Sequence, residues 1–130
     1  MVAIRTFDSA LVLRAPSDGA ETSTAAETGI AFDADKFGSF AAVVHVTAID
    51  RTTGDEQAVF SIEADTASGF SSPVAVATLP AVTATGTYEI PLSGRLIEQH
   101  ELGATHLRIK ATLSGTTPSV TYGAYLAPVG

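Results

Sequence analysis

Residues 105–113, with the sequence THLRIKATL, carry the pattern that most constrains what this chain can fold into. Alternate positions are mostly apolar, at Thr105, Leu107, Ile109, Ala111 and Leu113. The positions between them are polar, at His106, Arg108, Lys110 and Thr112. A period of two residues is typical of a β-strand with one face in the core and the other in water. The pattern therefore predicts a half-buried strand.

Similar runs recur along the chain at intervals of roughly ten to fifteen residues, separated by Gly, Pro and Ser. Residues 40–49 are almost entirely apolar, which is typical of a strand buried on both faces. Together with a second strand at residues 59–65, they are expected to form a hairpin across the polar turn 50–56. Leu92–Leu102 is expected to contain one short helical turn, which Gly103 can cap. The remaining expected strands lie at residues 10–14, 29–32, 74–79, 86–92 and 120–126.

These runs predict an all-β fold, an antiparallel, jelly-roll-like β-sandwich of seven to eight strands with one short helical turn. The expected core includes Val44, Val46, Phe60, Ile62, Leu107, Ile109 and Leu113. We interpret residues 1–130 as a single domain, since 130 residues suffice for one hydrophobic core. Residues 1–28 are expected to form an arm or a long loop, because residues 15–28 are polar and small and offer no packing side chains.

Composition excludes several classes of function. The chain has no cysteine, so it has no disulfides, zinc thiolates or cysteine nucleophiles, and assembly inside a cell is expected. Its net charge is −7, with four Lys or Arg against eleven Asp or Glu in residues 1–65, so direct binding of nucleic acid is not expected. No apolar run reaches the roughly 20 residues of a membrane span, so no membrane partner is expected.

The side chains able to do chemistry do not form a recognised motif. His45, His100 and His106 lack metal-binding spacing, although Glu98 and Glu101 could join the last two across a loop. His45 is interpreted as a hydrogen-bonded core imidazole and His106 as a solvated one. The acidic pairs Asp55/Glu56 and Asp33/Asp35 fall in polar turns, where local hydrogen bonding favours Asp. We therefore predict no enzyme activity, no metal and no cofactor.

The C-terminal half resembles the capsid cement, or decoration, proteins of tailed bacteriophages. The resemblance is carried by the run GTYEIPL, a short LI turn, GATH leading into LRIKA, then SGTTPS and YGAYL, which together cover roughly Thr83 to Pro128. The motifs build strands and turns and contain no catalytic signature. The resemblance implies a structural virion protein, made in the bacterial host cytoplasm, that binds the outer surface of the capsid. It also implies the major capsid protein as partner and stabilisation of the shell.

Two alternatives remain open from the sequence. One is a carbohydrate-binding or a tail- or fibre-associated β-sandwich module. Because the chain has no Trp, an aromatic platform for sugars is only weakly supported. The other is an enzyme with a hidden carboxylate or histidine site involving His100 or His106.

Self-association as a homodimer or homotrimer is also expected. Cement proteins act at symmetry axes, and the start of the chain carries apolar side chains that an oligomer interface would cover. The candidate interface consists of Val2, Ile4, Phe7, Leu11 and Leu13.

Overall fold

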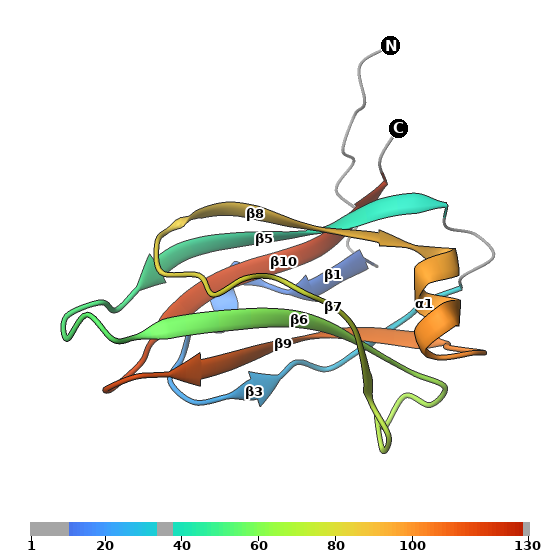
Figure 1. The fold of residues 1–130 in the computed structure, drawn as a ribbon, viewed down its shortest axis with the longest axis horizontal. Coiled ribbons are helices and arrows are strands. Elements are labelled where there is room, and N and C mark those ends of the chain that lie inside the picture. Colours follow the sequence, from blue (N-terminus) through green and yellow to red (C-terminus); the bar gives the residue numbers. More distant parts are fainter. Residues whose placement is uncertain (1–10, 34–37, 129–130) are drawn as a thin grey trace, which may run out of the picture.

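The computed structural model describes residues 11–33 and 38–128, which form two antiparallel sheets packed face to face (Figure 1). In the first sheet the order is β1 (Val12–Arg14), β10 (Val120–Pro128), β5 (Ser39–Ile49) and β8 (Gly86–Ser93), and β2 (Ala20–Glu21) also pairs with β10. In the second sheet the order is β3 (Ala25–Ala26), β9 (His106–Ser114), β6 (Gln57–Asp65) and β7 (Val74–Thr78), and β4 (Ile30–Ala31) also pairs with β9.

The path of the chain is that of a jelly roll. We count β1 with β2 as one strand of the jelly roll, and β3 with β4 as another, which leaves eight strands. Along the chain, β1/β2, β5, β8 and β10 belong to the first sheet, and β3/β4, β6, β7 and β9 belong to the second. The predicted sandwich is therefore confirmed. The described part has ten strands, more than predicted, because two positions are each made of two short strands, separated by residues 15–19 and 27–29.

The predicted hairpin of residues 40–49 with 59–65 is wrong. β5 and β6 lie in different sheets, and residues 50–56 cross from one sheet to the other. β5 is paired on both sides, with β10 and β8, so it has no free edge for β6. The strand at residues 40–49 was expected to be buried on both faces. It is so from Phe40 to Val44, and beyond Val44 the residues that point outward are exposed.

The core between the sheets follows the predicted alternation. Val44, Val46, Phe60, Ile62, Leu107 and Ile109 are each at most 1% exposed, while Leu113 is only half-buried and packs at the margin of the core. β10 contributes Val120, Tyr122, Ala124 and Leu126 to the same core.

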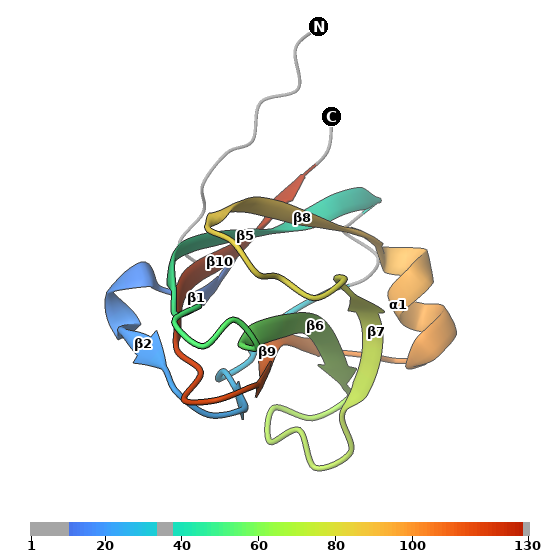
Figure 2. The ribbon, with the colours of Figure 1, turned by 60° about the vertical axis from the view of Figure 1, so that its left-hand side comes forward.

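Residues 15–28 depart from the expected polar loop. They contain a 3₁₀ turn (Pro16–Asp18) and the short strands β2 and β3, so this segment closes one side of the sandwich (Figure 2). The ring of Pro16, in the 3₁₀ turn, packs on Gly123. A Cβ added at Gly123 would lie only 2.6 Å from this ring. Gly123 is thus needed for this close approach of the backbone.

The predicted helical turn is the helix α1 (Gly94–His100), which lies beside β7 and β8 on the side of the sandwich opposite β2 (Figure 2). Ser93 begins the helix, because its Oγ accepts a hydrogen bond from the N–H of Leu96 at 3.0 Å. Ile97 is fully buried against the core.

At one end of the sandwich the loops 50–56 and 114–119 are held together. The carboxylate of Asp55 accepts hydrogen bonds from the N–H and Oγ1 of Thr116, at 3.0 and 2.9 Å. Gly115 has a φ of +100°, and a Cβ there would lie 2.5 Å from the carbonyl oxygen of Asp55. The two loops can approach this closely only because residue 115 is glycine.

Replacing Gly115 with Ala should therefore lower the free energy of unfolding by about 2 to 3 kcal/mol, since the clash is with backbone and the loops must separate. Gly103→Ala is the matched control, because Gly103 has a φ of +78° but no heavy atom within 4 Å of the added Cβ. It should cost about 1 kcal/mol or less. Urea denaturation measures both, and equal losses would show that the close approach at Gly115 is unimportant.

Candidate functional site

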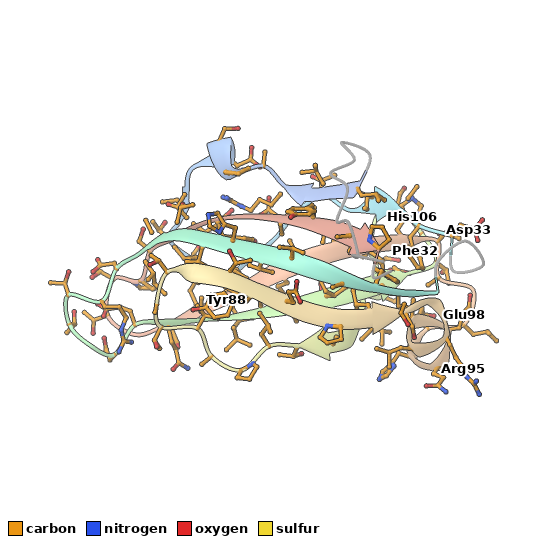
Figure 3. All side chains as sticks on the ribbon, turned by 90° about the horizontal axis from the view of Figure 1, so that it is seen from above. Phe32, Asp33, Tyr88, Arg95, Glu98 and His106 are labelled. Carbon is orange, nitrogen blue, oxygen red and sulfur yellow. The ribbon has the colours of Figure 1, made fainter. Side chains whose placement is uncertain are left out.

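A groove of about 410 Å³ lies over the outer face of the first sheet. Its apolar lining includes Val12, Pro16, Val43 and Tyr125, and Gly123 also lines it. Figure 3 views the molecule from the side of this sheet. The groove brings together β1, β5, β8 and β10, which are widely separated in the sequence, so no local motif could have indicated it. Its size and apolar lining are those of a binding groove rather than of a surface irregularity.

Among the residues that the structure describes, the polar part of the groove is small and includes no carboxylate. The Nδ1 atom of His45 lies 2.9 Å from the Oγ1 of Thr87 on the neighbouring strand, and both residues are exposed. The prediction of His45 as a core imidazole is wrong, because its position in β5 faces away from the core between Val44 and Val46. The groove can therefore offer hydrogen bonds to an uncharged partner, and its described lining contains no nucleophile paired with a carboxylate.

A buried ionic cluster lies next to the groove. Arg14 is 3% exposed, and its guanidinium donates hydrogen bonds to the carbonyl oxygens of Tyr122 and Gly19, at 2.7 and 2.9 Å. The same group lies 3.1 Å from the carboxylate of Glu21 and 3.5 Å from that of Glu27, and 4.5 Å above the ring of Tyr122. Glu21 belongs to the first sheet and Glu27 directly follows a strand of the second. Arg14 therefore ties the two sheets together along one edge.

Burial affects the titrating groups of this cluster. It raises the pKa of Glu27 above the ordinary value of a glutamate, the charge of Arg14 opposes the rise, and a hydrogen bond with Glu21 adds to it. Burial also raises the pKa of the Tyr122 phenol, with a further contribution from the charge of Glu27. Both pKa shifts arise because two carboxylates and a phenol are enclosed around one guanidinium. This cluster holds the fold together and does not by itself indicate catalysis.

The candidate interface residues from the sequence are only partly accessible. Leu13 is 3% exposed and belongs to the core, and Leu11 is half-buried against it, so neither offers a free apolar surface. The side chain of Leu13 faces the core, and the candidate interface stays a prediction. Val2, Ile4 and Phe7 lie outside the described residues.

The histidines and acids considered for chemistry have local partners. His100 lies at the end of α1 with Nδ1 3.0 Å from the carbonyl oxygen of Leu96, and Glu98 accepts a hydrogen bond from the N–H of Gly103 at 2.9 Å. His106 lies 2.8 Å from the hydroxyl of Thr105. Figure 3 shows Glu98 on α1 and His106 well apart from it. Within residues 11–33 and 38–128, no three side chains of the metal-ligating types are grouped.

The acidic pair Asp55 and Glu56 also holds the loops. Asp55 holds Thr116, as described above, and the carboxylate of Glu56 accepts hydrogen bonds from the N–H groups of Thr53 and Gly54, at 3.2 and 3.0 Å. Asp35 lies outside the described residues.

A second ordered cluster that the sequence did not indicate holds the loop between β6 and β7. Asp65 accepts hydrogen bonds from the N–H groups of Thr66 and Ser72, at 2.6 and 3.0 Å. Phe70, with a φ of +48°, is buried under Arg108, whose guanidinium lies 4.5 Å above the ring and 2.7 Å from the carboxylate of Glu63. The loop is therefore folded onto the second sheet rather than extended into solvent.

Hydrogen bonds from the N–H of Ser72 and of Thr66 lower the pKa of Asp65 below its ordinary value. A carboxyl whose pKa is lowered by folding stabilises the fold above its unfolded pKa, and this stabilisation is lost as the pH falls through the folded value. Asp65→Asn should thus lower the melting temperature at pH 7, and the difference from the parent should shrink below about pH 4. Calorimetry at a series of pH values measures this. A difference that did not change with pH would contradict the role of the charge.

Comparisons of the chain with protein-family models, with curated proteins and with solved structures gave no match. None of the helices in the described part is long and apolar enough to cross a membrane.

Proposed function

We propose that this chain is a structural virion protein that binds the outer surface of a bacteriophage capsid and stabilises the shell without catalysing a reaction. The observation that carries the proposal is that the cement-like sequence builds the jelly-roll framework. GTYEIPL lies in β8, the LI pair in α1, LRIKA in β9 and YGAYL in β10. Jelly rolls occur in viral capsid proteins and in lectins, so the fold is compatible with this function and with the glycan-binding alternative.

The way in which the loops are held supports a static binding role. Asp55 joins the two loops at one end of the sandwich, and Asp65 and Phe70 hold the loop between β6 and β7. A surface that is already ordered loses little conformational entropy when it binds. Such a surface suits a protein whose task is to hold neighbouring capsid subunits in one arrangement.

Many copies of the chain bind one shell, so each copy needs only a modest affinity for the capsid to stabilise it. A protein that binds only the assembled shell stabilises it by mass action, and oligomeric presentation raises the effective concentration of each further contact. Self-association as a homodimer or homotrimer is part of this proposal, and light scattering on the purified chain measures it. The net charge of −7 favours a less acidic or basic patch on the capsid, so binding should weaken as salt rises.

The test is to mix the purified chain with expanded shells from which cement protein has been stripped. We expect saturable co-sedimentation and release of DNA at a higher temperature from decorated shells than from bare ones. Undetectable binding, or identical release temperatures, would refute the proposal. Unexpanded shells are the control, because a cement protein recognises the arrangement of subunits that expansion creates.

The alternative function is a carbohydrate-binding or tail-fibre-associated module. The observation that favours it is the groove, where the half-exposed ring of Tyr125 lies near the hydrogen-bonding pair of His45 and Thr87. Titration of the isolated chain with a glycan panel distinguishes the two, since the cement proposal expects no saturable sugar binding.

A further inference from the structure

Part of the outer face of the first sheet is apolar and covered, although it faces away from the core. Phe40, Ala42 and Val44 of β5 belong to the core, so Ala41 and Val43 between them point outward. Both are nevertheless only 3% exposed within this single chain. Ala127, the partner of Ala41 on β10, is fully buried as well. Other atoms of the same chain therefore shield this face from solvent.

The described residues cover one end of this face. Pro16 packs on Gly123, and Gly123 pairs with His45, so the 3₁₀ turn borders the groove at that end. β1 pairs with β10 in antiparallel fashion, Val12 opposite Tyr125 and Arg14 opposite Ala124. Followed backward from Val12, the chain thus runs toward Ala127 and Ala41. A straight continuation of β1 beyond Val12 would lead toward the apolar outward positions.

The sequence of residues 1–10, MVAIRTFDSA, suits this position. Val2, Ile4 and Phe7 supply apolar side chains, while Arg5 and Asp8 supply charges that can remain in water. Ten extended residues span roughly 33 Å. The four strands from β1 to β8 span only about 15 Å at the usual spacing of paired strands, so this segment can reach across the whole sheet and the groove.

We propose that residues 1–10 dock over the outer face of the first sheet of their own chain and fill the groove. Their apolar side chains lie against Val43 and Tyr125, and His45 and Thr87 are available for hydrogen bonds to their backbone. The charge of Arg14, the one charged residue lining the groove within the described part of the chain, is compensated by Glu21 and Glu27, so the groove favours an uncharged surface. The proposal does not depend on capsid binding.

Disulfide trapping tests the proposal in the full-length chain, which has no cysteine of its own. Thr87→Cys in the groove is combined in turn with Val2→Cys, Ile4→Cys or Phe7→Cys. We expect at least one pair to form an intrachain disulfide under mild oxidation, seen by mass spectrometry and as a shifted monomer on a non-reducing gel. Thr112→Cys, exposed on the outward side of β9 in the second sheet, is the matched control and should form none.

Failure of all three pairs to form an intrachain disulfide would overturn the proposal. Disulfide-linked dimers as the main product would also overturn it, because the occupant would then belong to a second copy.

Limited proteolysis provides a second measurement. Trypsin can cleave after Arg5 only when that segment leaves the surface, so docking slows cleavage. His45→Glu, which places a charge in the groove, should accelerate cleavage by about tenfold. Thr47→Glu is the matched control, since Thr47 is an exposed, outward residue of the same strand but does not line the groove, and its rate should equal that of the parent. Equal rates in all three proteins would contradict docking, while shell binding is measured separately.

Discussion

Replacing Arg14 with Met is expected to lower the free energy of unfolding by about 3 to 5 kcal/mol. The side chain is 1% exposed and is enclosed by Glu21 and Glu27, whose side chains are 22% and 16% exposed. Without the guanidinium, two partly buried carboxylates face each other without compensation, and the carbonyl oxygens of Gly19 and Tyr122 lose their donor. Urea denaturation at pH 7 measures the loss.

The triple variant Arg14→Met, Glu21→Gln, Glu27→Gln separates charge from packing. It removes the uncompensated carboxylates, so it should recover a large part of the stability lost in the single variant. The pH dependence has a definite sign as well. Because the pKa of Glu27 is raised by burial, its contribution to stability is present below the unfolded pKa and is lost as the pH rises through the folded value.

The loss in Arg14→Met should thus be smaller at pH 4 than at pH 7, because protonation removes the unpaired negative charges. If the single and triple variants were equally unstable at both pH values, the role of Arg14 would be packing rather than charge.

The alternation along single strands was predictable because it is a local property. In β9 it identified which residues face the core, since one slip of register would expose every apolar side chain. The pairing of strands was less predictable. The polar turn after β5 indicated a hairpin, yet β5 already has two partners whose positions depend on residues far along the sequence. Only the complete arrangement of the sheets excludes that hairpin.

Arg14 shows why the ionic cluster was missed. Simple alternation places Arg14 on the opposite face from Leu13, which would make it a solvated charge. The pairing of β1 with β10 shifts in register between Val12 and Arg14, so both Leu13 and Arg14 are buried. The nearest signal in the sequence is the pair of glutamates at 21 and 27, which are far apart on an extended chain. They meet only because residues 16–26 turn back across the edge of the sandwich.

Capsid binding and the docking of residues 1–10 are compatible proposals, because they use different surfaces of the protein. Docking of residues 1–10 uses the outer face of the first sheet, and it leaves the second sheet and both loop ends for a capsid or for another copy of the chain. It also changes how the apolar start of the chain is understood. Val2, Ile4 and Phe7 suggested self-association from the sequence because nothing in the sequence alone shows a groove to receive them. An oligomer interface would then be formed by other residues.

Truncation of Ile109 to Ala is expected to lower the free energy of unfolding by about 2 to 5 kcal/mol, because it leaves a cavity between the sheets that neighbouring side chains cannot fill completely. Ile109 is fully buried in the middle of β9, and it pairs with Ile62 of β6. Leu113→Ala is the matched control, on the same face of the same strand but only half-buried, so its loss should be clearly smaller. Denaturant unfolding of both variants tests the register as well as the packing. Equal losses at the two positions would mean that the core does not follow the alternation from which the fold was predicted.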